Sequence, residues 1–375
     1  MKEFRKKFSA LLIMFLLIFM LLYTLFREKG EMSFQENRSL AQLPELKISE
    51  IINGKTSLKL TDFFSDQIAG RSKFMKIYAD ISAGNSESKV NGIFISENRL
   101  LNGNIDTSDI DSSVSEKINS FTEKYNSSFY FIAVPSSDGV YSNLLPEYIP
   151  PDFQSEQIQN FYNNLNPEIR KIDAFNILKN FSDDYIYYRT DTKWTAYGAY
   201  CVYRTAIQKL GFIPVAYDKF TIEHVTSEFN GNLYNKSLYE ISKKDFIDLY
   251  YSESINIQSI TAYNQNLNES MRILYDKSFL NSNYMYNIYL GENVPALRIK
   301  TNVNNNKKLM VIKDSYADCF IPFLTQHYSE ITVISTDFPD FRFTDYFNIN
   351  SYEQVIFICG SENLLNPDSM DILDN

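Results

Sequence analysis

Two polar segments of the sequence each follow directly on a strand-like run of apolar and aromatic residues. Arg189–Trp194 comes after Tyr185–Tyr188, and Lys313–Ala317 comes after Leu309–Ile312. Because open α/β sheets form their sites at the carboxyl ends of strands, we expect both segments at one edge of one sheet. A serine hydroxyl in such a place is a weak nucleophile unless a neighbouring base takes its proton. The sequence therefore raises the question of which group would serve as that base.

The basic residue of the first segment is Lys193, two residues after Asp191. An ordinary lysine is almost fully protonated at neutral pH and accepts a proton only when its pKa falls. Burial lowers the pKa of a lysine, whereas a carboxylate beside it raises that pKa, so we expect an ion pair between the two side chains. His327 is an alternative base, but it would lie about three helical turns beyond Ser315 if the intervening helix is continuous.

The same residues also have simpler structural explanations. A serine directly after a strand often caps the helix that follows, by accepting hydrogen bonds from free backbone amides. Asp191 suits an N-cap or a solvated surface acid equally well. Trp194 suits the core of the domain better than a sugar-stacking platform.

The composition excludes several classes of site and partner. The net charge is -10 and the pI is near 4.9, which argues against nucleic acid and against a strongly anionic lipid surface. Three cysteines, Cys201, Cys319 and Cys359, are too dispersed for a disulfide framework and are expected as buried free thiols. Two histidines without ligand spacing give no basis for a zinc site, while calcium sites stay open. We expect no cofactor and no metal.

The N-terminal region predicts a membrane anchor. The stretch from Phe8 to Phe26 contains no charged residue and is long enough to cross a hydrocarbon core of ~30 Å. Four basic residues precede it and a mixed set follows, so we expect a single-pass protein of the cell membrane with a cytoplasmic N-terminus and an extracytoplasmic C-terminal domain. A cleaved signal peptide is the alternative, although its apolar core is usually shorter and ends in small residues.

The rest of the chain predicts an α/β fold with a parallel sheet. Continuous apolar runs at Phe129–Val134 and Leu309–Ile312 are typical of strands buried on both faces, and Ile331–Ile334 and Val355–Ile358 are spaced by segments that suit helices. Tyr185–Tyr188 is expected as a further strand. Helices are expected from short apolar stripes broken near Gly70, from a capping box at Ser113 and Glu116, and at 153–165 and 194–210, the last ending at Gly211.

The expected organisation has four parts: a cytoplasmic tail at 1–7, the anchor at 8–26, a polar spacer at 27–60 and an ectodomain at 61–375. Within the ectodomain, 215–305 is expected as an inserted β-rich subdomain with strands near 248–251, 271–275 and 286–290. Removal of 1–30 is expected to give a soluble protein, because the anchor is the only long apolar segment.

The sequence resembles the DHHW family, bacterial envelope proteins of the SGNH hydrolase superfamily that are related to the alginate O-acetylation proteins. The residues that carry the resemblance are Glu36-Asn37-Arg38 with Leu40 and Pro44, Phe64-Ser65-Asp66-Gln67 with Arg71, Val134-Pro135-Ser136, Tyr188-Arg189-Thr190-Asp191, Trp194-Thr195 with Gly198-Ala199-Tyr200, and Lys313-Asp314-Ser315-Tyr316-Ala317. It implies a parallel-sheet SGNH-hydrolase-like domain, with Ser315 as the nucleophile and Asp191 as the orienting acid. Where the family has its catalytic histidine, this chain has Lys193.

The resemblance leads to two hypotheses of function. In the first, the protein is a serine acetyltransferase or esterase that acts on a surface polysaccharide through Ser315, Asp191 and Lys193, with amides of the following helix holding the oxyanion. In the second, which we favour, the missing histidine impairs catalysis and the protein binds glycan or a membrane acyltransferase partner. A purely structural envelope protein is a third alternative. The residues expected to face the substrate are Arg189, Trp194, Tyr316, Gly360 and Asn363.

Overall fold

The computed structural model describes residues 2–33, 38–45, 50, 53–84, 89–96, 98–264, 266 and 268–374. Two residues of the resemblance, Glu36 and Asn37, lie outside this set. The chain forms two units, one from Met1–Ile93 with Tyr234–Glu240 and the other from Phe94–Leu233 with Ile241–Asn375. The second unit holds the segments with candidate chemistry.

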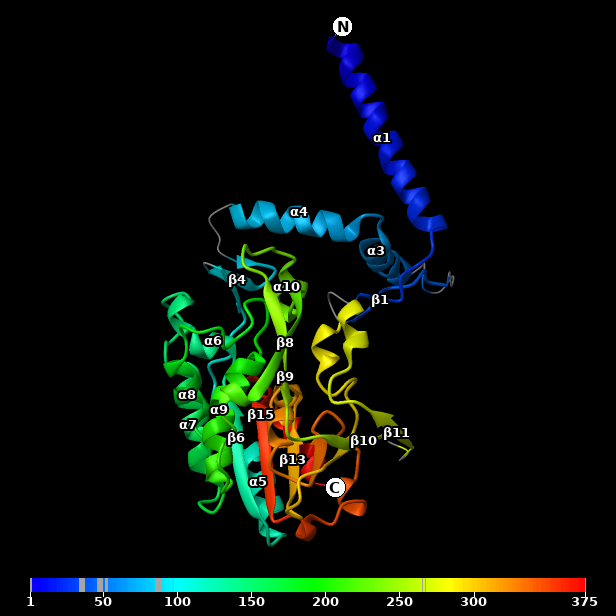
Figure 1. Ribbon diagram of the computed structural model, residues 1–375. Coiled ribbons are helices and arrows are strands. Elements are labelled where there is room, and N and C mark those ends of the chain that lie inside the picture. Colours follow the sequence, from blue (N-terminus) through cyan, green and yellow to red (C-terminus); the bar gives the residue numbers. More distant parts are fainter. Residues whose placement is uncertain are drawn as a thin grey trace. The chain divides into compact units, whose positions relative to one another are not determined.

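The central sheet of the second unit has the strand order β11-β10-β12-β14-β13-β15-β6-β7. Its parallel part consists of β6 (Ser128–Val134), β7 (Arg170–Lys171), β13 (Lys308–Lys313), β14 (Glu330–Ser335) and β15 (Gln354–Gly360). The strands β13 and β15 lie in the middle of this part, and their apolar side chains are buried on both faces. This confirms the predicted parallel α/β sheet (Figure 1).

The segment 215–305 is rich in strands, as predicted, but part of it extends the central sheet. The antiparallel strands β10 (Ile257–Tyr263), β11 (Glu269–Arg272) and β12 (Ala296–Thr301) continue that sheet beyond β14. Only β8 (Phe220–Phe229) and β9 (Asp245–Ser252) pair in a sheet of their own. The predicted strand at 286–290 is wrong, because the 3-10 helix η4 (Met285–Ile288) covers most of that range. The rings of Tyr286 and Tyr289 pack together with their centroids 5.4 Å apart.

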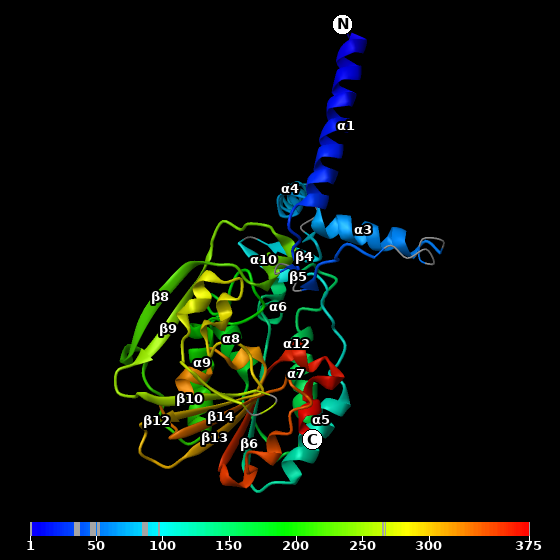
Figure 2. The ribbon, with the colours of Figure 1, turned by 90° about the vertical axis from the view of Figure 1, so that its right-hand side faces the viewer.

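Helices cover both faces of the central sheet, and the side chains of β6 show the division. Tyr130, Ile132 and Val134 pack with residues of α8 (Ala174–Asn180), α9 (Ala196–Lys209) and α11 (Ile321–Leu324). Phe129 and Phe131 pack with residues of α5 (Ser112–Glu123), α7 (Phe153–Asn164) and the 3-10 helix η8 (Pro367–Leu373). Figure 2 shows α8 and α9 on one side of the sheet and α5 and α7 on the other.

Shorter elements connect these parts. They are β3 (Lys89–Val90), β4 (Ile93–Ser96), β5 (Arg99–Asn102), α6 (Ser137–Val140), α10 (Asn232–Ser237) and α12 (Ser361–Leu364), with the 3-10 helices η1 (Ser142–Leu144), η2 (Tyr217–Lys219), η3 (Lys277–Asn281), η5 (Ser315–Ala317), η6 (Phe343–Asp345) and η7 (Ile349–Ser351).

Two predicted helix ends can be compared with the structure. The expected capping box of α5 is wrong at its first residue: Asp111 is the N-cap, and its carboxylate accepts a hydrogen bond from the backbone N–H of Ser113. The aspartate starts the helix two residues earlier, so the amide that is capped is that of Ser113 and not that of Glu116. At the end of α9 the prediction is confirmed, because Gly211 follows the helix with a φ of +88°.

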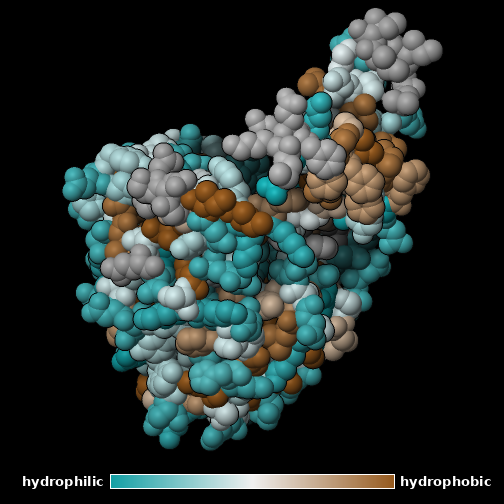
Figure 3. All heavy atoms as spheres, turned by 90° about the horizontal axis from the view of Figure 1, so that it is seen from above, coloured by the Kyte–Doolittle hydropathy of each residue, from teal (hydrophilic) through white to brown (hydrophobic). Residues whose placement is uncertain are grey.

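The first unit contains the long apolar helix. Its elements are α1 (Lys2–Phe26), β1 (Met32–Ser33), β2 (Arg38–Ser39), α3 (Lys55–Gln67) and α4 (Arg71–Gly84). Within α1 the stretch Lys7–Phe26 is long and apolar enough to cross a membrane, and its side chains are mostly exposed (Figure 3). Part of the expected spacer packs on α3, since Gln67 bonds both the carbonyl and the amide of Gly30. The part boundaries stay a prediction.

Candidate functional site

The segment around Asp191 is a closed loop rather than the end of a strand of the central sheet. Tyr187 and Trp194 form an isolated antiparallel bridge, and the backbone N–H of Tyr188 donates to the carbonyl of Lys193 at 3.2 Å. The prediction of a strand at Tyr185–Tyr188 is therefore wrong. Its apolar pattern reflects burial in the core between the sheet and α9, where Tyr187 and Tyr188 have no exposed surface.

A buried carboxylate fixes the start of this loop. Asp245, which has no exposed surface, accepts hydrogen bonds from the backbone N–H groups of Arg189 and Thr190, both at 2.8 Å. It also accepts bonds from the hydroxyls of Thr190 and Tyr185, at 2.6 and 2.7 Å. The Arg189 guanidinium lies 3.6 Å from the same carboxylate and 4.4 Å from the centroid of the Tyr185 ring. Asp245 therefore holds the loop in one conformation.

Two backbone amides hold the Asp191 carboxylate. Its Oδ1 accepts a bond from the N–H of Lys193 at 3.1 Å, and its Oδ2 accepts one from the N–H of Asn232 at 2.7 Å. The backbone of Gly231 passes so close that a Cβ atom there would stand 2.5 Å from Asp191 Cβ. Asp191 is nearly buried, so its position and its hydrogen-bond acceptors are fixed by neighbouring backbone.

The ammonium group of Lys193 lies among carboxylates and tyrosine rings. Its Nζ is 3.9 Å from Asp191 Oδ1, 5.6 Å from the centroid of the Tyr316 ring and 5.4 Å from that of Tyr286. Burial by itself would lower the pKa of Lys193, but the charges of Asp191, Glu362, Asp314 and Asp318 together raise this pKa above its ordinary value. At neutral pH the side chain is therefore an ammonium ion without a lone pair to accept a proton.

The second segment is a tight turn directly after β13. Asp314 is the N-cap of the short η5 helix, and its Oδ1 accepts a bond from the N–H of Tyr316 at 2.9 Å. The cap is thus Asp314 and not Ser315. Ser315 is half-buried, and within the part of the chain that the structure describes its hydroxyl makes no hydrogen bond. Because η5 is followed by a break before α11, the helix expected after Ser315 is not continuous.

Gly360 and Asn363, which were expected to line the site, both donate hydrogen bonds to Asp314. The N–H of Gly360 and the side-chain amide of Asn363 both donate to Asp314 Oδ2 at 2.7 Å. Burial raises the pKa of Asp314 to about 6, although these bonds favour its ionised form. The Asp314 carboxylate thus engages an amide N–H of each of these two residues.

The two segments meet through Trp194, Thr192 and Tyr316. The indole N–H of Trp194 donates to the carbonyl of Tyr316 at 2.7 Å, and its rings stack on Phe320 at 5.8 Å. The hydroxyls of Thr192 and Tyr316 both donate to Glu362 Oε1, at 2.8 and 2.7 Å. Trp194 and Tyr316 are buried, so their rings serve packing and are not presented to a ligand.

The family to which the chain belongs follows from this region. The model of the DHHW family, described as DHHW protein, matches residues 124–334, which is more than half of the chain. The chain belongs to the DHHW family. No curated protein sequence matches it.

Solved structures of similar proteins share the fold of this DHHW protein. A DHHW family protein from Eubacterium siraeum is 22% identical, with a TM-score of 0.66 over 76% of this chain and 96% of that one. PatB1 from Bacillus cereus is 21% identical, with a TM-score of 0.60 over 72% and 96%. A second PatB1 structure, with a sulfonyl adduct, is 20% identical, with a TM-score of 0.59 over 72% and 95%. The second unit thus has the α/β fold of these proteins.

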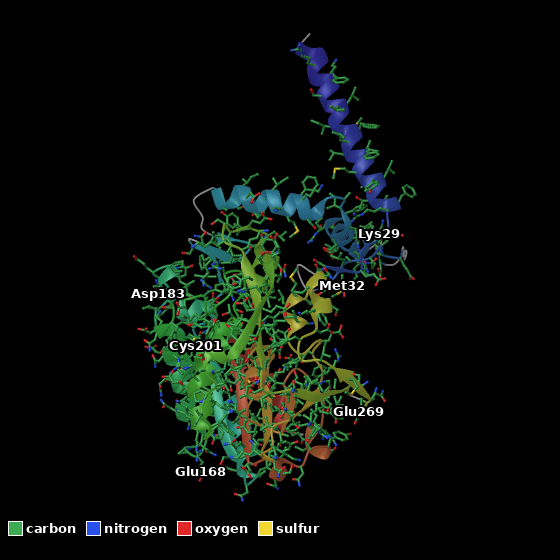
Figure 4. The ribbon with its side chains drawn as sticks, viewed as in Figure 1. Lys29, Met32, Glu168, Asp183, Cys201 and Glu269 are labelled. Atoms are coloured by element: carbon green, nitrogen blue, oxygen red, sulfur yellow. The ribbon has the colours of Figure 1, made fainter. Side chains whose placement is uncertain are left out.

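A cavity of about 390 Å³ lies beside Arg189 in this DHHW protein. Arg99 lines it with its guanidinium 3.9 Å from the centroid of the Tyr141 ring, and Arg99 Nη1 donates to the carbonyl of Tyr188 at 2.7 Å. The hydroxyl of Tyr141 is buried without a hydrogen-bond partner among the described residues. The remaining lining includes Asp183, Asp184, Tyr185 and Lys243, and Figure 4 labels Asp183 on the outside of the molecule.

His327 lies in the core and not at the site. Its Nε2 is 2.7 Å from the hydroxyl of Tyr203, and burial lowers the pKa of the imidazole to about 4. The rings of Tyr203 and Phe212 pack against it, with centroids 5.7 and 5.1 Å away. His327 is therefore a neutral structural residue. The three cysteines are buried free thiols, as predicted.

Sequence reasoning missed two carboxylates that organise the site. Glu362 follows β15 within two residues, so the rule that sites form at the carboxyl ends of parallel strands would have found it. Asp245 starts β9, far along the chain from the loop that it binds, and no local signal identifies it. The direct approach of Asp191 to Ser315 stays a prediction.

Proposed function

We propose that this DHHW protein is a membrane-anchored, extracytoplasmic protein of cell-surface polysaccharide O-acetylation or deacetylation, and that it binds glycan or a partner without efficient turnover. The polysaccharide role comes from its resemblance to the DHHW family and the alginate O-acetylation proteins. The observation that supports loss of turnover is the charge of Lys193, which stands where the family has a histidine.

Among the residues that the structure describes, neither Lys193 nor His327 is suited to take the proton of the Ser315 hydroxyl. A serine attacks an ester only if a base takes its proton, and general-base assistance contributes about 10²- to 10⁴-fold. Lys193 is an ammonium ion, and His327 is bonded to Tyr203 in the core. A serine without a base keeps the fold and the cleft of the family while losing most of the rate.

Membrane anchorage by α1 is part of the proposal. The exposed apolar stretch Lys7–Phe26 supplies the span, and the basic residues before it favour a cytoplasmic N-terminus. The folded domain then lies outside the cell membrane, where surface polysaccharide is found. A membrane acyltransferase is the candidate protein partner.

The cavity beside Arg189 is the proposed glycan-binding site. Arg99 makes one hydrogen bond to the chain, to the Tyr188 carbonyl, and has no ion pair among the described residues. Its guanidinium is held flat on the Tyr141 ring, which leaves further N–H groups for a carboxylate or phosphate of a glycan. Burial lowers the pKa of Arg99, as is expected for a cation that lacks a partner.

A sulfonyl reagent tests the missing base directly. Phenylmethylsulfonyl fluoride forms an S–O bond with an activated serine, loses fluoride and transfers the hydroxyl proton to a base. We expect the full chain in detergent to gain no sulfonyl mass at Ser315 and to hydrolyse p-nitrophenyl acetate no faster than Ser315→Ala. PatB1, whose structure has been solved with a sulfonyl adduct, serves as the positive control. Sulfonylation of Ser315, with a rate that collapses in Lys193→Ala, would instead establish an active enzyme with a neutral lysine base.

Glycan binding has a separate test. Titration calorimetry of the full chain with an oligogalacturonate should show binding that weakens about tenfold or more in Arg99→Gln, because a charge-assisted hydrogen bond is lost. Lys219→Gln, a change at an exposed lysine of η2, is the matched control and should bind as the unchanged protein does. Equal binding by Arg99→Gln would show that the cavity is not the glycan site. It would leave the proposed loss of turnover unchanged.

A further inference from the structure

The helix α4 presents its large apolar side chains outward. Phe74, Ile77, Tyr78 and Ile81 have exposed fractions of 53, 54, 60 and 59%. Their spacing of three, one and three residues places them on one helix face. The opposite face is inward, with Ala79 fully buried and Met75 half-buried. A helix at the surface of a soluble domain has the reverse arrangement.

Two hydrogen bonds connect the turn between α3 and α4 to the end of α1. The backbone N–H of Ala69 donates to Thr24 Oγ1 at 3.3 Å, and the Arg27 guanidinium donates to the carbonyl of Gln67 at 3.0 Å. Thr24 is in the last turn of the apolar stretch Lys7–Phe26. The turn between α3 and α4 is therefore bonded to the point where α1 would leave the membrane, and α4 begins two residues later.

We propose that α4 lies in the membrane interface, with its Phe74–Ile81 face among the lipid headgroups and the first acyl carbons. This inference rests on the proposed anchorage by α1. Apolar patches of this kind on a soluble surface mark an interaction site, and a helix with one apolar and one polar face suits the plane of the interface. Tyrosine is also favoured at that depth, because its ring is apolar and its hydroxyl is polar.

Lipid is favoured over a protein as the occupant because the contact with α1 fixes the depth of α4. A helix that starts beside the last turn of a membrane span has its exposed side chains within reach of the same leaflet. The expectation that removal of 1–30 gives a soluble protein therefore changes: the α4 face would still bind membranes.

Tryptophan scanning of the full chain in phosphatidylcholine vesicles with brominated acyl chains tests the proposal. Trp194 is fully buried and gives a constant background. We expect brominated lipid to quench the added emission of Tyr78→Trp by about twofold or more, as for a side chain at the headgroup boundary. Tyr148→Trp, at a tyrosine with 74% exposure in the second unit, is the matched control and should not be quenched.

A third variant separates this inference from the anchorage on which it rests. Phe15→Trp, in the middle of α1, should be quenched strongly if α1 spans the membrane. Quenching of Phe15→Trp without quenching of Tyr78→Trp would overturn the interfacial placement of α4 and leave the anchorage in place. A blue-shifted Tyr78→Trp emission that brominated lipid does not quench would show that a second copy or another protein covers the face, which also overturns it. An unquenched Phe15→Trp would overturn both.

Discussion

The surroundings of Lys193 and of His327 hold these two basic side chains in opposite charge states. Lys193 lies near carboxylates of three segments, which raise its pKa and keep it an ammonium ion. His327 lies among aromatic rings, where burial lowers its pKa to about 4 and keeps the imidazole neutral. His327, the neutral base, is bonded to Tyr203 in the core, whereas Lys193, the cation, lies beside Asp191. The environment of a group, more than its residue type, therefore decides whether it can accept a proton.

Replacing Lys193 with a histidine should have the largest effect, because it puts a neutral base where the cation now stands. We expect Lys193→His to raise the hydrolysis of p-nitrophenyl acetate by about 10²- to 10⁴-fold, because a histidine accepts the serine proton near neutral pH and Asp191 is already held by two amides. The control is Lys193→His with Ser315→Ala, which should be silent. If Lys193→His hydrolyses the ester no faster than the unchanged protein, the side chains at 193 and 315 are too far apart for proton transfer.

The buried Asp138 should change stability with pH in the opposite direction from His327. Burial, with the charge of Glu362, raises the pKa of Asp138 from 3.8 to about 7. The folded state then holds a proton that the unfolded state loses, so stability falls as pH rises from about 4 to about 7, by at most roughly 4 kcal/mol. Asp138→Asn keeps an oxygen for the Asn102 N–H and should flatten this slope in urea unfolding of the full chain. An unchanged slope would mean that Asp138 is ionised in the folded protein.

On the core side, His327 should destabilise the protein in acid. Its pKa falls from 6.5 to about 4 on folding, so the unfolded state binds the proton first and stability is lost as pH drops through this range, by at most roughly 3 kcal/mol. His327→Phe should remove that loss, at a pH-independent cost of about 1 kcal/mol for the lost Tyr203 bond. The same change in Lys193→His should leave the esterase rate as it was. A large fall in rate would place His327 in the mechanism.

The smallest expected effect concerns the position of Asp191. In the Lys193→His background, Gly231→Ala should lower kcat by about tenfold, because the new methyl group displaces the acid that orients the imidazole. Gly211→Ala is the control: its backbone φ of +88° is strained for alanine, but no atom lies within 4 Å of the added carbon, so stability should fall without a change in kcat. Equal kcat values for both variants would show that Asp191 does not need its fixed position.

The local sequence pattern was sufficient to predict the parallel sheet and the family. The strands β6, β13, β14 and β15 were predicted because a strand covered on both faces is apolar at every position. The same signal failed at Tyr185–Tyr188, where an equally apolar run is buried in a loop that Asp245 holds. A run of buried residues reports burial and does not report which partner strand, if any, satisfies the backbone.

The sequence by itself determined that a lysine stands in the place of the family's histidine, next to Asp191. It also predicted an ion pair with Asp191, but only the tertiary structure showed which further carboxylates act on the lysine. Glu362, Asp314 and Asp318 come from distant parts of the chain and act on Lys193 because the carboxyl ends of β13 and β15 bring them there. Coulomb interactions depend on distance in space and on the surrounding dielectric, and neither quantity is written in the order of residues.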